Sequence, residues 1–217
     1  MKPLALLCSL ALVACSDARD YSQAVAVLID VSGTYADQTP EVARIVKREI
    51  LPALVPGDTI AIVRIDSESY KKQNVEALVT LDNRPSHANA QKLELAKKLD
   101  AFAARGERSQ YTDIPGAMML AAEYLHETGA KSRAIVLFSD MQSDLPPGAK
   151  RHFGEHEFEG VRIVALNVKQ LARDNANPDV LRGRLASWEQ EVTHAGAGGF
   201  TTFLDAEKLG SFLADIR

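Results

Sequence analysis

Four apolar runs constrain this sequence more than any other feature. They lie at residues 24–29, 59–65, 134–138 and 161–166, and polar residues scarcely interrupt them. A strand with one face in water alternates apolar and polar residues, whereas a parallel strand covered on both faces is apolar throughout. The runs therefore predict a mostly parallel sheet buried between two layers of helices.

The segments between these runs carry helix signals. Thr39 and Pro40 open a helix that should reach about Ala53, because proline is favoured at the first helical position. Another helix should begin at Asp113 and end before Gly129, a residue typical of helix C-termini. The remaining expected helices begin at Ser86, Asn177 and Asp205.

Two further strands complete the expected sheet. Val75–Leu81 alternates in polarity, which is typical of an edge strand, and Phe200–Leu204 forms the last strand. Strands and helices alternate without a Pro- or Ser-rich linker, which predicts one domain over residues 24–217. The expected fold class is α/β: a Rossmann-like, doubly wound, mostly parallel six-stranded sheet with helices on both faces.

The first fifteen residues read as an export signal. Lys2 precedes an apolar run over residues 4–13, and ten helical residues span about 15 Å, half of a bilayer core. A signal peptide fits this length better than a membrane-spanning helix. The run ends at Leu12-Val13-Ala14-Cys15, which resembles the lipobox of bacterial lipoproteins, where the cysteine is acylated and becomes the first mature residue. A buried N-terminal strand with an incidental cysteine is the alternative.

The lipoprotein resemblance implies a signal peptide over residues 1–14, a lipidated tether over 15–23 and a membrane anchor at Cys15. It places the protein in the bacterial cell envelope. Ser16 favours the outer membrane, facing the periplasm, while Asp17 leaves the inner membrane open. Two or more acyl chains anchor a protein stably where one chain does so only marginally.

Cysteine content and charge exclude other classes. Cys8 and Cys15 are the only cysteines, so the body of the chain has neither a disulfide nor a thiolate metal site. The formal net charge is −4, which argues against a nucleic-acid partner because such proteins present a basic face.

Polar residues stand where the buried runs end. In an open parallel sheet, ligands bind at the carboxyl ends of the strands, where the strand order reverses. Asp30–Thr34 follows the first run, and Ser139-Asp140 follows the run at 134–138. Thr112 directly precedes the helix expected at Asp113. We therefore expect these three loops to converge.

This constellation resembles a von Willebrand factor A (VWA) domain with its metal-ion-dependent adhesion site. That family has Asp-x-Ser-x-Ser in the first loop, a Thr in the second and an Asp after a later strand. The resemblance covers residues 24–216 and implies an antiparallel edge strand, which Val75–Leu81 can supply. Carried over residue by residue, it implies the metal ligands Asp30, Ser32, Thr34, Thr112 and Asp140.

Two positions depart from the family pattern. Thr34 replaces the second serine of the first loop and keeps a hydroxyl. Met141 stands after Asp140, where many members have glycine, and is expected to change access to the third loop.

The implied ligand set suits a hard cation. Mg²⁺ takes six oxygen ligands at about 2.1 Å and retains water readily. Two carboxylates and three neutral hydroxyls leave the ion with positive charge and an open position. We expect Mg²⁺ first, with Mn²⁺ or Ca²⁺ as alternatives. A carboxylate of another protein would complete the shell, so a membrane-anchored module for metal-dependent protein–protein interaction is expected. A structural or assembly lipoprotein that uses the same fold without metal is the alternative.

No enzyme is expected from the motifs. Asp30-Val-Ser-Gly-Thr34 is one residue from the Asp-x-Asp-Gly-Thr motif of haloacid-dehalogenase-like phosphatases, but Ser32 cannot serve as a general acid at neutral pH. A phosphohydrolase is therefore the weakest alternative. His152 and His156 have helical ligand spacing, yet Gly154 disfavours a helix and the glutamate is misplaced for a zinc protease. This segment is expected to be a solvated loop.

Overall fold

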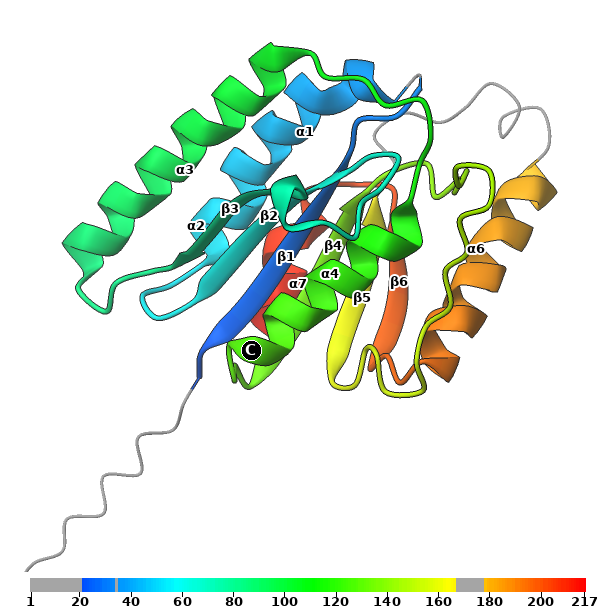
Figure 1. Ribbon diagram of the computed structural model, residues 1–217. Coiled ribbons are helices and arrows are strands. Elements are labelled where there is room, and N and C mark those ends of the chain that lie inside the picture. The colour runs from blue at the N-terminus through cyan, green and yellow to red at the C-terminus, as the bar shows by residue number, and fades with distance from the viewer. Residues whose placement is uncertain (1–20, 34, 167–177) are drawn as a thin grey trace, which may run out of the picture.

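The computed structural model describes residues 21–33, 35–166 and 178–217. A six-stranded sheet with the order β3-β2-β1-β4-β5-β6 forms its centre (Figure 1). All neighbouring strands are parallel except β2 and β3, which are antiparallel. The strands are β1 (Gln23–Asp30), β2 (Thr59–Ile65), β3 (Val75–Thr80), β4 (Ser132–Phe138), β5 (Val161–Leu166) and β6 (Gly199–Phe203).

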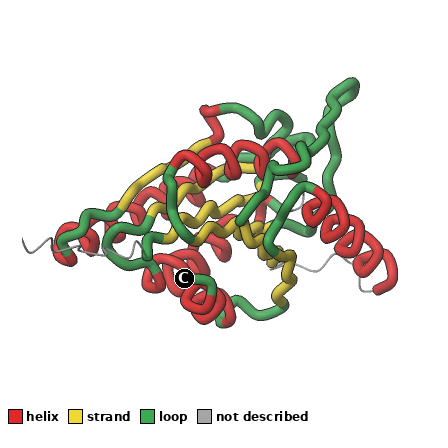
Figure 2. The backbone as a smooth tube through the Cα atoms, turned by 90° about the horizontal axis from the view of Figure 1, so that it is seen from below, coloured by secondary structure: helices red, strands yellow, loops and turns green. Residues whose placement is uncertain are grey.

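Helices cover both faces of this sheet, as Figures 1 and 2 show. Because side chains alternate along a strand, β1 contributes Val27 to one apolar layer and Leu28 to the other. The first layer contains α1, α3 and α7, and the second contains α4 and α6. The α-helices are α1 (Thr39–Ile45), α2 (Leu51–Ala53), α3 (Pro85–Arg105), α4 (Ile114–Glu127), α6 (Pro178–His194) and α7 (Lys208–Asp215).

The helix expected over residues 39–53 contains an irregularity. A π-helical turn, Val46–Ile50, separates α1 from α2, and the N–H of Leu51 bonds to the carbonyl of Val46. Pro52 lacks an N–H and cannot continue the regular helical ladder, which accounts for the widened turn just before it. Short 3₁₀ turns lie at Ala36–Gln38 and Lys72–Asn74.

The connection between β4 and β5 has no helix in the described residues 139–160. Parallel strands are usually joined by a helix, and irregular loops longer than about 15 residues are uncommon. This segment, the β4–β5 loop, runs over the surface between α4 and α6 (Figure 1). It contains residues 152–156, which were expected to form a loop.

An ion pair between Asp58 and Arg217 lies at the end of the sheet where β1 begins. Asp58 is fully buried, and its carboxylate accepts hydrogen bonds from Nη1 and Nη2 of Arg217 at 2.8 and 2.7 Å. The backbone N–H groups of Gln23 and Val55 donate to the same carboxylate at 3.0 and 2.7 Å. This pair ties the start of β1 to the end of α7.

The N-terminal predictions fall largely on residues that the structure does not describe. The signal peptide at 1–14, Cys15 and most of the tether lie outside the described residues, which begin at Tyr21. Within the described residues, no helix is both long and apolar enough to cross a bilayer.

Candidate functional site

The strand order reverses at β1, which pairs with β2 on one side and β4 on the other. This arrangement places the carboxyl ends of β1 and β4 side by side at the position where ligands bind open α/β sheets. Asp30 ends β1, and Ser139 and Asp140 follow β4. The fold thus brings together two of the three loops that sequence analysis singled out.

Asp30 is the centre of a buried hydrogen-bond network. Its side chain is buried, and its Oδ1 accepts from the N–H and the Oγ of Ser32 at 2.8 and 2.5 Å. Its Oδ2 accepts from Oγ of Ser139 at 2.7 Å. Ser139 therefore links the first loop to the third, a role that sequence analysis did not assign. Its position directly before Asp140 was the available signal.

The environment disfavours the charge on Asp30. Burial raises the pKa of Asp30 from 3.8 to about 6, although hydrogen bonds from Ser32 and Ser139 lower it in part. The carboxylate of Asp140 lies close enough to raise the pKa of Asp30 further. A cation between the two carboxylates would offset both the desolvation and the repulsion.

Asp140 lies in a tight turn. Its Oδ1 accepts from the N–H of Gln142 at 2.7 Å. Met141 has a φ of 60°, a left-handed conformation that glycine adopts without strain. This conformation explains why glycine suits the position. The methionine side chain is buried in the layer of α4 and α6, and its carbonyl accepts from Nε1 of Trp188 at 2.8 Å.

The second loop is tied to the third through Thr112. The N–H of Thr112 donates to the carbonyl of Asp144 at 2.7 Å, and the N–H of Asp144 donates back at 3.0 Å. The Oγ of Ser143 also donates to the Thr112 carbonyl at 3.0 Å. Thr112 is itself buried, and these hydrogen bonds to Ser143 and Asp144 fix its backbone.

The second loop also contacts the first. The N–H of Gly33 donates to the carbonyl of Ser109 at 3.1 Å, and the N–H of Ser109 donates to the carbonyl of Val31 at 2.8 Å. All three loops are therefore joined by hydrogen bonds. Four predicted ligands, Asp30, Ser32, Thr112 and Asp140, lie on them, while Thr34 lies outside the described residues.

The donor set consists of carboxylates and hydroxyls. Over residues 21–33, 35–166 and 178–217, no cluster of three or more His, Cys, Asp or Glu side chains forms a metal site. The candidate site has two carboxylates, from Asp30 and Asp140, and takes its other donors from Ser32 and Thr112. An all-oxygen set of this kind fits Mg²⁺.

Asp113, the residue after Thr112, fixes the second loop through the hydrogen bonds of its side chain. It is fully buried at the start of α4, and its carboxylate accepts from the N–H of Gly116 at 2.9 Å and the N–H of Ser69 at 3.1 Å. Nη2 of Arg151, in the β4–β5 loop, donates to the same carboxylate at 2.7 Å. A Cβ at position 116 would lie 2.3 Å from Oδ2 of Asp113, so this cap requires glycine.

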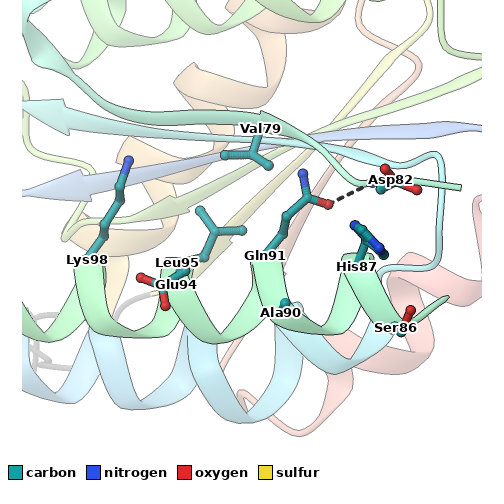
Figure 3. A pocket seen from close by; sticks show the side chains of 9 residues that line it. All are labelled: Val79, Asp82, Ser86, His87, Ala90, Gln91, Glu94, Leu95 and Lys98. Atoms are coloured by element: carbon teal, nitrogen blue, oxygen red, sulfur yellow. Dashed lines mark hydrogen bonds between the residues drawn. The ribbon is translucent and has the colours of Figure 1, made fainter. Parts of the chain in front are cut away.

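Two of the pockets in the described part of the chain have none of the predicted ligands in their lining. A pocket of about 380 Å³ adjoins the first loop, and Arg64 and Arg108 belong to its polar lining. A larger groove of about 610 Å³ lies between β3 and α3 (Figure 3). Val79 and Leu95 are among its apolar residues, and the N–H of Asp82 donates to Oε1 of Gln91 at its edge. None of the predicted ligands lines this groove.

No family model and no curated protein matches the chain. Among solved structures, the conserved hypothetical protein BatB from Bacteroides thetaiotaomicron aligns with a TM-score of 0.52 and 13% identity, over 90% of this chain and 98% of that one. The PilB minor pilin from Streptococcus sanguinis, as its D319A mutant, aligns with a TM-score of 0.52 and 10% identity, over 90% of this chain.

These likenesses concern the fold alone. The chain spans 60% of the PilB structure. The doubly wound sheet with one antiparallel edge strand, β3, is the VWA-like architecture that the sequence predicted, and that prediction is confirmed.

Proposed function

We propose that this chain is a lipid-anchored bacterial module that holds a divalent cation and, through it, binds an acidic residue of another protein. The observation that carries the proposal is the buried Asp30 at the switch point, held by Ser32 and Ser139 beside Asp140. A carboxylate is seldom buried without a partner of opposite charge.

Each donor has a distinct task in this proposal. Asp30 and Asp140 supply the negative charge, and Ser32, Thr34 and Thr112 supply neutral oxygens. Ser139 orients Asp30. Because only two ligands are charged, bound Mg²⁺ retains positive charge and attracts a further carboxylate.

The anchored orientation follows from the direction of β1. The strand begins at Gln23, next to the tether, and ends at Asp30 at the opposite edge of the sheet. Residues 15–23 extend to about 30 Å at most. The domain therefore stands close to the membrane with its cation site facing away. Labelling that finds the Asp30 loop shielded by the membrane would contradict this orientation.

The fold likenesses are compatible with a role in protein interaction. PilB is named as a minor pilin. The likeness supports the proposal only through the shared fold, because its identity to this chain is 10%.

The metal test compares wild type with Asp30→Ala and with Asp37→Ala. Asp37 is a matched control because it lies just beyond the first loop but is exposed and pairs with Arg108. Isothermal titration with Mg²⁺ and Mn²⁺ should show binding by wild type and Asp37→Ala and none by Asp30→Ala. Equal binding by all three variants would exclude the site.

The partner test uses cross-linking and capture from membranes with the same variants, with and without chelator. Metal-mediated recognition predicts that chelator and Asp30→Ala remove the same partners. If the partners persist in both cases, the domain acts as a metal-free assembly lipoprotein instead. Phosphoester turnover that depends on Asp30 would support the phosphohydrolase alternative.

A further inference from the structure

The β4–β5 loop is held against the site by an ion pair whose carboxylate is buried. Nε of Arg151 donates to Oδ1 of Asp113 at 3.2 Å, and Nη2 donates to Oδ2 at 2.7 Å. The side chain of Asp113 is 1% exposed and that of Arg151 is 26% exposed. A bidentate Arg–carboxylate contact fixes orientation as well as distance.

This pair lies one residue from a proposed metal ligand. Asp113 follows Thr112, whose backbone N–H and carbonyl both bond to Asp144. Asp144 in turn follows Asp140 in the same loop. The loop thus contacts the second site loop twice, through the backbone at Asp144 and through the side chain of Arg151.

We propose that Arg151 is a positioning residue of the cation site: its ion pair with Asp113 holds the β4–β5 loop in register, so that Thr112 and Asp140 face one cation. This inference rests on the proposed function. It explains how a long connection without a helix can present a ligand accurately. Residues that orient metal ligands commonly change metal affinity 10- to 100-fold when they are replaced.

The chain offers a closely matched control at the other end of the sheet. Asp58 is also buried, also accepts two backbone N–H groups and also receives a bidentate arginine, Arg217. The side chain of Arg217 is 20% exposed. Arg151→Met and Arg217→Met therefore remove equivalent pairs, one beside the proposed site and one far from it.

The experiment measures Mg²⁺ affinity by isothermal titration for wild type, Arg151→Met and Arg217→Met, at a temperature where circular dichroism shows all three folded. Arg151→Met should weaken binding about tenfold or more, and Arg217→Met should leave it within about twofold. Arg151→Lys keeps the charge without the bidentate geometry, should fold like wild type and should also weaken binding.

A second measurement does not depend on metal. Hydrogen exchange in chelator should show faster exchange of the Thr112 and Asp144 amides in Arg151→Met than in Arg217→Met, because the backbone bridge between them loosens. Wild-type affinity in both Arg151 variants, or equal losses in Arg151→Met and Arg217→Met, would overturn the positioning role alone. Absence of binding by wild type would overturn the proposed function and this inference together.

Discussion

Replacement of Asp30 with asparagine should change stability in opposite directions in the absence and presence of Mg²⁺. The pKa of Asp30 is raised from 3.8 to about 6, chiefly by burial. The folded protein therefore binds this proton more tightly than the unfolded chain does. The contribution of Asp30 to stability is greatest below about pH 4 and is lost as the pH rises through about 6.

The magnitude follows from the same shift. Because the pKa of Asp30 rises from 3.8 to about 6 on folding, the free energy of unfolding falls by about 3 kcal/mol between pH values below 3.8 and pH values above 6. Asparagine is neutral, and its Oδ1 can still accept from the N–H of Ser32. In chelator at pH 8, Asp30→Asn should therefore be more stable than wild type by up to about 3 kcal/mol, and this advantage should disappear near pH 4.

Mg²⁺ should reverse the order. Wild type gains about 4.1 kcal/mol at a ligand concentration 1,000 times Kd, which exceeds the advantage of about 3 kcal/mol that Asp30→Asn has in chelator, whereas Asp30→Asn gains nothing. Urea unfolding followed by circular dichroism between pH 4 and pH 8.5, in chelator and in Mg²⁺, measures both effects. An Asp30→Asn variant less stable than wild type in chelator at pH 8, or an advantage that does not vary with pH, would refute the electrostatic reasoning.

Other parts of the molecule give further predictions. Arg217→Met leaves the carboxylate of Asp58 buried without its cation and should lower the free energy of unfolding by about 3–5 kcal/mol in urea titrations. Gly116→Ala places a Cβ 2.3 Å from Asp113 and should be destabilising by about 1–3 kcal/mol. Gly183→Ala in α6 has open space and should be stabilising by about 1 kcal/mol, so thermal melts of the two variants should shift in opposite directions. Cys15→Ala should abolish incorporation of labelled fatty acid and release the protein from membranes; full labelling would exclude Cys15 as the anchor.

The fold was predictable because its signals are local. The apolar runs marked the buried strands, and the polarity alternation of Val75–Leu81 marked the edge strand that the structure shows as β3. The π-helical turn before Pro52 was not anticipated, because it depends on which backbone bonds the proline removes. Local sequence predicted that a helix begins at Asp113, but it did not predict that Arg151 binds the Asp113 carboxylate.

The candidate site was only partly predictable for the same reason. Asp30, Ser32, Thr112 and Asp140 stand at strand and helix ends, where sequence order alone suggests convergence. The hydrogen bond from Ser139 to Asp30 and the ion pair of Arg151 join residues far apart in the chain. Such contacts depend on the path of the β4–β5 loop, and the pattern of apolar residues in the sequence does not predict the path of an irregular loop.

The central position of β1 affects how a newly made chain reaches this fold. β1 comes first among the strands, yet one of its two neighbours, β4, begins only at Ser132. About 100 residues separate the two strands, so β1 meets β4 only after a long stretch of chain has emerged. Until then an uncharged run, Ala24–Ile29, has one unpaired edge and is prone to aggregate with other chains. The strand that ends in Asp30 is thus also a segment that needs protection until the second half of the domain has been made.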